Sequence, residues 1–231
     1  MENGIPSDHT RQRLLSAYHS LDEQYGPQQW WPADSPFEIM VGAVLTQNTA
    51  WANVEKAIGN LKAADCLDAE RIAALPSADL AELIRPSGYF NVKAKRLGAF
   101  CKWYMDRGQH AGLARLETPL LRKALLSVHG IGPETADDML LYAFGRAVFV
   151  IDAYTRRIFS RLDILDGRLS YEALRSLIEG ALPADNRLFS QYHALIVQHG
   201  KDICRKRPRC DGCCVRRFCV FEMLASKAKS V

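Results

Sequence analysis

Five of the seven cysteines stand within sixteen residues near the C-terminal end of the sequence, which is typical of a metal centre. They are Cys204, Cys210, Cys213, Cys214 and Cys219, and four of them fit the pattern Cys-x5-Cys-x2-Cys-x5-Cys. Four thiolates spaced in this way can surround a tetrahedral zinc ion or an iron–sulfur cluster. An odd number of cysteines and a start without an apolar export signal argue against a disulfide framework. The choice between Cys213 and Cys214 as the third ligand stays open.

A second group of residues has the chemistry to hold a phosphate and to stabilise a positive charge. In the segment 128–136, VHGIGPETA, Gly130 and Gly132 flank an apolar residue and allow a tight turn between two helices. Free N–H groups at the start of the second helix can bind a phosphate oxygen, although an ordinary helix–helix turn has the same pattern. Asp152 follows eighteen residues after Glu134, where an aspartate either caps a helix or acts as a charged catalytic group.

The elements that must position these groups are predicted to be helices. Leu14, Leu15, Tyr18 and Leu21 form one helical stripe, and Ser35 before Pro36 is a helix-start signal. The apolar run 147–152 is too short to build a sheet, so an all-α fold is expected. Further helices are predicted over 36–47, 50–61, 78–84, 92–104, 120–128, 133–144, 153–162, 171–182 and 186–199.

The charge distribution points to a polyanionic partner. Residues 201–231 hold nine Lys or Arg and three Asp or Glu, whereas the other 200 residues hold 21 basic and 23 acidic residues. A nearly neutral body with a basic end favours nucleic acid, although such ends are often only solvated. No apolar run approaches the roughly 20 residues of a membrane span, so no membrane association is expected.

The order of these motifs resembles the endonuclease III superfamily of DNA glycosylases, which carry a helix-hairpin-helix, a Gly/Pro-rich loop and an aspartate. The resemblance runs from about Trp30 to Cys219 and includes SPFEIMVGAVLTQNT at 35–49 and IRPSGYFNVKAKRL at 84–97. It implies a six-helix barrel domain with the hairpin at 29–145. Residues 1–28 and 146–231 would form a second helical domain with the catalytic aspartate and the cysteines. DNA and Asp152 would lie between the two domains.

The resemblance also implies the chemistry. Asp152 would be the catalytic carboxylate, which stabilises positive charge on the sugar as the base departs. Bifunctional members carry a lysine two residues after the second hairpin glycine, where this sequence has Glu134. A carboxylate cannot form an imine, so strand cleavage by that route is not expected.

The segment Trp30-Trp31-Pro32 and the motifs after it resemble one branch, the bacterial 3-methyladenine DNA glycosylases of the endonuclease III type. That branch also has glutamate at the position of Glu134, and aromatic residues at the positions of Trp31 and Trp51 hold the flipped base between them. The resemblance therefore implies a base pocket formed by Trp31, Trp51 and Glu134. Indole faces attract a flat cation, and N3- or N7-alkylated purines are cationic. Core packing is the ordinary role of such tryptophans.

Further residues are expected to contact DNA because the superfamily uses these positions. Gln47 would fill the space left by the flipped base, and Tyr89 and Phe90 would wedge into the opposite strand unless they only pack within their loop. The hairpin and the basic loop among the cysteines would bind phosphates. Their predicted DNA-binding residues are His129, Gly130, Ile131, Gly132, Thr135, Arg205 and Arg207.

The cysteines of the superfamily hold a [4Fe–4S] cluster, which implies that Cys204, Cys210, Cys213 and Cys219 are its ligands here. The first gap has five residues in this sequence, whereas the superfamily usually has six. Zinc therefore stays a competitor on chemical grounds.

These observations predict a monofunctional DNA N-glycosylase of base excision repair that flips and hydrolyses alkylated purines from duplex DNA. The alternatives are a uracil or thymine mismatch glycosylase, a glycosylase for another lesion, a non-catalytic DNA-damage-binding protein or a zinc-bound adaptor. The expected partner is damaged double-stranded DNA. We expect a monomer in the cytoplasm, associated with the nucleoid if the source is bacterial.

Overall fold

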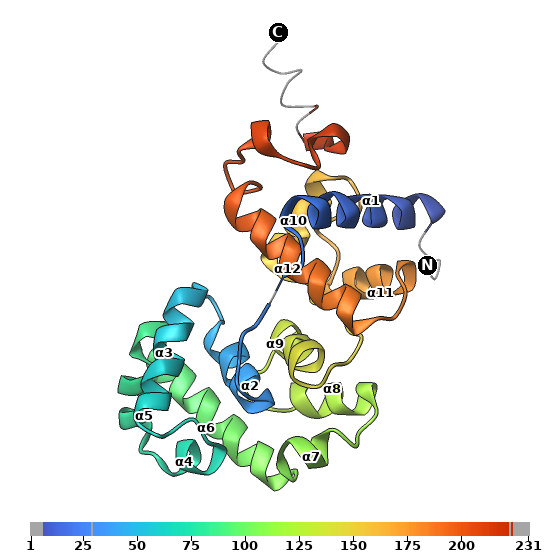
Figure 1. Ribbon diagram of the computed structural model, residues 1–231. Coiled ribbons are helices and arrows are strands. Elements are labelled where there is room, and N and C mark those ends of the chain that lie inside the picture. The colour runs from blue at the N-terminus through green and yellow to red at the C-terminus, as the bar shows by residue number, and fades with distance from the viewer. Residues whose placement is uncertain (1–6, 29, 222, 224–231) are drawn as a thin grey trace. The chain divides into compact units, whose positions relative to one another are not determined.

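The computed structural model describes residues 7–28, 30–221 and 223, and it confirms the predicted all-α fold. Within these residues there are helices and no strands (Figure 1). The α-helices are α1 (Asp8–Tyr25), α2 (Pro36–Leu45), α3 (Trp51–Ala63), α4 (Ala69–Ala74), α5 (Ser77–Leu83), α6 (Phe90–Asp106), α7 (Gln109–Leu113), α8 (Thr118–Leu126), α9 (Pro133–Asp138), α10 (Ala153–Arg161), α11 (Tyr171–Ala181) and α12 (Asn186–Asp202). Shorter helical segments are η1 (Arg85–Ser87), η2 (Met139–Ala143), η3 (Cys210–Gly212) and η4 (Arg216–Phe218).

The chain divides into two compact units. The terminal unit contains residues 1–30 and 147–231, and the central unit contains residues 31–146. In the terminal unit, α12 packs against α1 and α10, so both ends of the chain contribute to one core (Figure 1). The fully buried Tyr192 of α12 donates its hydroxyl hydrogen to the Leu14 carbonyl of α1 at 2.9 Å, which satisfies its polar end inside that core.

The central unit is built around α2 and α6. Helix α2 starts as predicted, because the Ser35 hydroxyl accepts the Glu38 amide at 3.2 Å and Pro36 occupies the first turn. The side chains from Met40 to Leu45 are buried, and α6 packs against α2, α4 and α5. A helix that is buried on nearly all sides fits the continuous apolar sequence of α2.

The structure departs from the predicted helices in three places. The short helices α4 and α7 were not anticipated, because five or six residues carry too little periodicity to be recognised. The helix predicted over 133–144 changes at Met139 into the π-helical turn η2, in which the Phe144 amide bonds the Met139 carbonyl at 3.1 Å. None of the described helices is long and apolar enough to cross a membrane.

A buried ion pair joins the two helices of the hairpin. Arg122 of α8 donates from Nε and Nη2 to the two carboxylate oxygens of Asp137 on α9, at 2.6 and 3.1 Å. The Asp137 side chain is fully buried, and only 13% of the Arg122 side chain is exposed. Two parallel charge-assisted bonds fix both the distance and the rotation of α9 relative to α8.

Replacing Asp137 with Ala should therefore lower the free energy of unfolding by about 3–5 kcal/mol, because a buried guanidinium loses its counter-charge. Urea unfolding measures the loss. Glu82→Ala is the control, since Glu82 pairs with Arg85 at 3.0 Å while both side chains stay more than half exposed, and it should cost less than about 1 kcal/mol. Equal losses in the two variants would contradict the structural role given to the buried pair.

Candidate functional site

Asp152 stands at the start of α10, where it acts as the N-cap. Its Oδ1 accepts the Thr155 amide at 2.7 Å, so the ordinary capping role considered from sequence is present. The preceding residues Val148 to Ile151 are buried and lie outside any helix, and the Phe149 amide bonds the Glu179 carboxylate at 2.9 Å. An anchored apolar segment on one side and a helix on the other hold the carboxylate in place.

The second carboxylate oxygen of Asp152 faces His193 of α12. Nε2 of His193 lies 3.7 Å from Oδ2, and both residues are buried. Burial raises the pKa of Asp152, but His193 and Thr155 lower it by more, so the pKa lies below its usual value. The carboxylate is therefore ionised at neutral pH. No local pattern indicates this role of His193, because Asp152 is 41 residues away in the sequence.

Trp31 and Trp51 are in contact, together with Tyr142 from the π-helical turn η2. The ring centroids of Trp31 and Trp51 are 5.3 Å apart at an interplanar angle of 69°, and those of Trp31 and Tyr142 are 5.1 Å apart at 33°. The two tryptophans thus meet edge to face, and a base could enter between them only if a ring turned. Tyr142 was not predicted, because its position depends on the extra residue in the π-helical turn. We call these three residues the aromatic group.

Trp31 is held in an uncommon backbone conformation. Its φ is 62°, in the left-handed region that non-glycine residues rarely adopt. Its indole packs on Gly42 of α2, where an added Cβ would lie 3.1 Å from Nε1. Trp30, by contrast, lies in the terminal unit under the Lys201 ammonium, 5.1 Å from its ring centroid. The two adjacent tryptophans therefore have different surroundings.

Gln47 joins the hairpin to α6. Its Nε2 donates to the Gly130 carbonyl at 2.9 Å and to the Thr135 hydroxyl at 3.0 Å, and its Oε1 accepts Arg96 at 2.5 Å. The stem of Arg96 covers Gly130, where φ is +88° and a Cβ would lie 2.5 Å from Cδ of Arg96. Glycine is therefore required at position 130 for two reasons: the backbone is left-handed there, and a side chain would collide with Arg96.

The other predicted hairpin residues surround the start of α9. Gly132 is the N-cap of α9 without a side-chain bond, Ile131 is 6% exposed, and Thr135 is buried. His129 and Glu134 are exposed. The turn thus presents a helix start with polar residues on its surface.

Tyr89 and Phe90 differ in exposure. Tyr89 is 73% exposed and has a φ of 47°, whereas Phe90 is half-buried with the Arg85 guanidinium 5.4 Å from its ring centroid. An exposed aromatic ring on a left-handed residue suits insertion into another molecule, whereas Phe90 already has a packing partner.

Cys204, Cys210, Cys213 and Cys219 line one small cavity, whose remaining lining is apolar except for Arg161. Cys214 is not among the described residues that line it, which favours Cys213 as the third of the four. All seven cysteines are free thiols. The donor set therefore fits a cysteine-ligated centre by its chemistry and its common cavity. However, no three His, Cys, Asp or Glu side chains of the described residues are grouped closely enough to hold a single metal ion.

Polar contacts surround the four thiols. Arg161 donates to Sγ of Cys204 at 3.3 Å, and Nε2 of His199 lies 3.5 Å from Sγ of Cys213. Burial raises the pKa of Cys213 to about 12 and lowers the pKa of His199 to about 4. A thiol in this setting ionises only when a bound cation offsets the cost of burying the thiolate.

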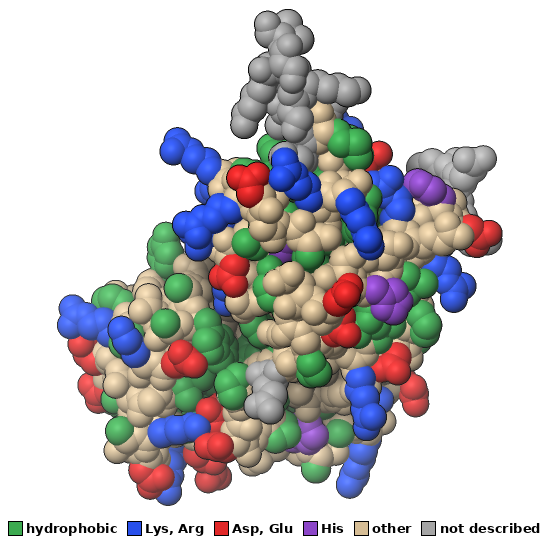
Figure 2. Space-filling view, turned by 45° about the horizontal axis from the view of Figure 1, so that its top comes forward, with side chains coloured by type: hydrophobic (Ala, Val, Ile, Leu, Met, Phe, Trp, Pro, Cys, Tyr) green, Lys and Arg blue, Asp and Glu red, His purple; other side chains and the backbone are tan. Residues whose placement is uncertain are grey.

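Arg205 and Arg207 are exposed, together with their neighbours Lys206 and Arg209. Figure 2 shows several Lys and Arg side chains around the C-terminal end of the described chain, with acidic side chains among them. The segment offers positive charge to a polyanion without forming a uniformly basic face.

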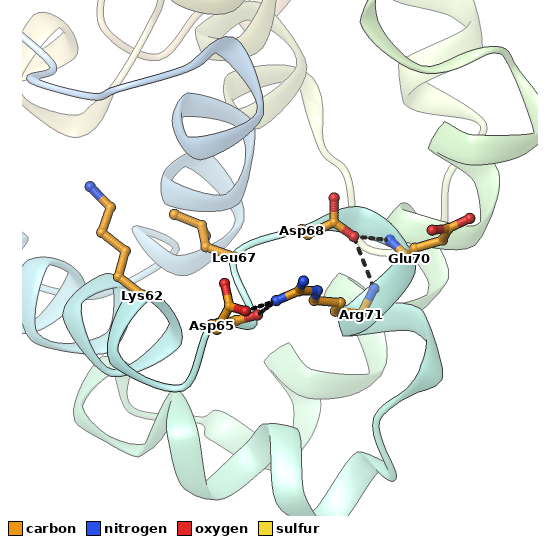
Figure 3. Close-up of a pocket in the computed structure, with 6 residues that line it drawn as sticks. All are labelled: Lys62, Asp65, Leu67, Asp68, Glu70 and Arg71. Atoms are coloured by element: carbon orange, nitrogen blue, oxygen red, sulfur yellow. Dashed lines mark hydrogen bonds and ion pairs between the residues drawn. The ribbon is translucent and has the colours of Figure 1, made fainter.

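A surface hollow in the central unit contains a different set of groups. It is lined by Lys62, Asp65, Leu67, Asp68, Glu70 and Arg71 (Figure 3). Arg71 pairs with Asp65, Asp68 caps α4, and Lys62 pairs with Asp34 and Glu38. These charges already have partners and no aromatic ring lines the hollow, so it does not resemble a base-binding site.

Residues 41–184 match the HhH-GPD superfamily, described as base excision DNA repair proteins. A candidate DNA repair glycosylase of Methanocaldococcus jannaschii is 45% identical over 210 residues, which cover 90% of this chain and 96% of that protein. Endonuclease III of Escherichia coli is 26% identical over 189 residues, covering 81% of this chain and 85% of that one.

Two solved structures are also similar. The 3-methyladenine DNA glycosylase of H. pylori, bound to 1,N6-ethenoadenine, is 31% identical with a TM-score of 0.70, covering 83% of this chain and 97% of that one. Endonuclease III in a non-covalent DNA complex is 21% identical with a TM-score of 0.81, covering 94% and 98%. The second likeness concerns the fold alone.

We expect His193→Gln to raise the pKa of Asp152, because the histidine is a main cause that opposes burial. The side-chain carboxyl 13C shift of Asp152, followed by NMR against pH, measures the change. A lowered pKa means that the ionised group stabilises the fold above the usual carboxyl pKa, and that this stabilisation is lost as the pH falls through the folded value. His19→Gln, which changes an exposed residue of α1, should leave the Asp152 titration unaltered. If the titration midpoint of Asp152 is unchanged in His193→Gln, then His193 does not set the ionisation of Asp152.

Proposed function

Because the chain belongs to the HhH-GPD superfamily of base excision DNA repair proteins, we propose that it releases alkylated purines, of the 3-methyladenine kind, from duplex DNA without cutting the strand. The superfamily match and the relatives show that the chain is a DNA glycosylase, which hydrolyses the bond between a base and its sugar. The preference for alkylpurines and the lack of lyase activity belong to the proposal.

The aromatic group carries the proposal. An N3- or N7-alkylated purine is a flat cation, and electron-rich rings attract it by stacking and by cation–π interaction, about 0.5–2 kcal/mol per ring. Trp31, Trp51 and Tyr142 meet at ring distances of 5.1–5.3 Å. Rotation of one indole would open a slot between them. The 31% identical H. pylori glycosylase, solved bound to 1,N6-ethenoadenine, supports a modified purine as the substrate base.

Asp152 would supply the charge that the reaction needs. The departing base leaves positive charge on the sugar, and an ionised carboxylate stabilises that charge and orients water. A cationic alkylpurine leaves without being protonated, so no general acid is required. The lowered pKa of Asp152 and its fixed position at the start of α10 suit this role.

Strand cleavage would be absent because no amine stands at the hairpin position that forms an imine. Glu134 occupies the first turn of α9, and a carboxylate cannot make that bond. DNA would be held by the hairpin and by exposed basic residues such as Arg205 and Arg207, while Gln47 and Tyr89 would enter the duplex as the base leaves it.

The proposal predicts that the protein releases alkylated bases from methylated DNA, identified by mass spectrometry. Asp152→Asn should abolish release and leave DNA affinity equal or higher.

Trp51→Ala should slow release by about five- to a hundred-fold, the value of roughly 1–3 kcal/mol of base stacking, while Trp51→Phe keeps most of the rate. Affinity for DNA with an abasic site should barely change, since there is no base to stack.

Two outcomes would contradict parts of the proposal. If wild-type protein ignores alkylated DNA but frees uracil or thymine from mismatches, alkylated purines are not its substrate. The chain would still be a DNA glycosylase. In the same reactions the product strand should stay intact, and borohydride should trap no covalent protein–DNA adduct. Efficient trapping would mean that another amine acts as nucleophile.

A [4Fe–4S] cluster on Cys204, Cys210, Cys213 and Cys219 is part of the proposal. The shared, mostly apolar cavity supports it, because four thiolates around one cavity are a donor set that holds such a cluster. Such a cluster would shape the basic cysteine segment (residues 204–219). It has no part in base release.

Protein purified without oxygen should accordingly be yellow-brown and contain about four irons per chain. Cys210→Ser should lose the iron, whereas Cys214→Ser should retain it, because Cys210 lines the cavity and Cys214 is not among the described residues that line it. One zinc and no iron by metal analysis would reject the cluster and favour the zinc alternative.

A further inference from the structure

Lys93 of α6 is a buried lysine whose ammonium makes three short hydrogen bonds. The residue is 1% exposed. Its Nζ donates to the Leu45 carbonyl at 2.7 Å, to the Thr49 hydroxyl at 2.6 Å and to the Ser87 carbonyl at 2.7 Å. All three hydrogens of the ammonium thus have acceptors. A charged group is rarely buried without such compensation, because its removal from water costs several kcal/mol.

The acceptors lie where helices end. Leu45 is the last residue of α2, and Ser87 is the last residue of η1. Carbonyls at a helix C-terminus lack intrahelical partners and carry partial negative charge, so a cation is the natural partner for them. Burial and the nearby charge of Arg96 lower the pKa of Lys93 to about 8, while the three acceptors favour the charged form at neutral pH.

Each acceptor lies in, or directly before, a loop with a residue proposed to enter DNA. Residues 46–50, which follow Leu45, form the plug loop and contain Gln47. Residues 84–89 form the wedge loop, which contains Ser87 and the exposed Tyr89. The Thr49 hydroxyl also donates to the Ser87 carbonyl, so the two loops share one polar centre. The Lys93 ammonium donates hydrogen bonds to the plug loop at Thr49 and to the wedge loop at Ser87.

A second cation of α6 acts on the same loop. Arg96, three residues after Lys93, holds the Gln47 amide oxygen, and the amide nitrogen bonds the hairpin carbonyl of Gly130. In this arrangement Arg96 fixes the side chain of Gln47, whereas Lys93 fixes the backbone around it. Gln47 can leave its partners by side-chain rotation while the loop stays in place.

We infer that Lys93 is a positioning residue that holds the plug loop and the wedge loop at a fixed separation, so that Gln47 and Tyr89 act on the duplex together. This rests on the roles proposed above for those two residues. Lys93 is buried away from solvent and touches neither DNA nor the reacting atoms. Its contribution is to the opening of the duplex and not to the cleavage of the glycosidic bond.

The test compares Lys93→Met, which keeps the length of the stem, with Lys95→Met, an exposed lysine of the same helix. One substrate is an alkylated purine within a duplex, and the other is the same lesion in single-stranded DNA, which needs no opening. Single-turnover release from the duplex should fall at least about tenfold in Lys93→Met, as expected if more than about 1.4 kcal/mol of duplex opening is lost. Release from the single strand should change by less than about twofold. Lys95→Met should match the wild type.

A second readout does not depend on turnover. Duplex DNA with an abasic site opposite 2-aminopurine should become more fluorescent when wild-type protein unstacks the probe, and Lys93→Met should lose most of this increase. If wild-type protein releases no alkylated base, the proposed substrate is wrong, and the fluorescence still tests Lys93.

Equal slowing on both DNA substrates, or an unchanged fluorescence increase, would show a role in stability alone and overturn the inference. Thr49→Val serves if Lys93→Met does not fold, because it removes one acceptor and keeps the buried charge. It should shift both readouts in the same direction by a smaller factor. No shift with folded Thr49→Val would equally overturn the inference.

Discussion

A helix start leaves backbone N–H groups without partners, and at the start of α10 the missing partner is the carboxylate of Asp152. That single requirement places the side chain, limits its rotation and keeps one oxygen occupied by the Thr155 amide. Only the second oxygen remains for chemistry, with His193 beside it. The cap and the proposed catalytic role are therefore not competing interpretations. The bond that begins the helix also holds the carboxylate in place, and together with His193 it keeps the group ionised, as the proposed catalytic role requires.

Cations perform the matching task at helix ends and loops of the central unit. Lys93 binds the carbonyls that close α2 and η1, Arg96 binds Gln47, and Arg122 joins α8 to α9 through Asp137. Lys93 and Arg96 connect segments that are 48 and 49 residues apart in sequence, whereas Arg122 connects two consecutive helices. Their stems also fill space, as the contact of Arg96 with Gly130 shows. The loops proposed to enter DNA are thereby positioned without covalent links.

The sequence predicted the fold class, most of the longer helices and the superfamily, because apolar periodicity and motif order are local or nearly local signals. The expectation that Trp31 and Trp51 hold a flipped base between them stays a prediction; in the structure their rings meet edge to face, and Tyr142 joins them from a π-helical turn that periodicity cannot show. Lys93 was not singled out, since NVKAKRL offers three cations that look alike until the helix is oriented. His193 was not singled out either, for a similar reason. The role of His193 depends on which face of α12 lies next to Asp152, and only tertiary packing determines that face.

The cysteine segment is tied to α10 through backbone atoms. Arg157 donates to the carbonyls of Gly200 and Cys204, and Arg161 donates to those of Arg205 and Lys206. Every residue type provides the same carbonyl, so these attachments do not specify the side chains that follow Cys204. The side chains of residues 205–209 can therefore be exchanged without loss of these four hydrogen bonds. If the segment binds DNA as proposed, its basic residues can be tuned to that contact without disturbing α10.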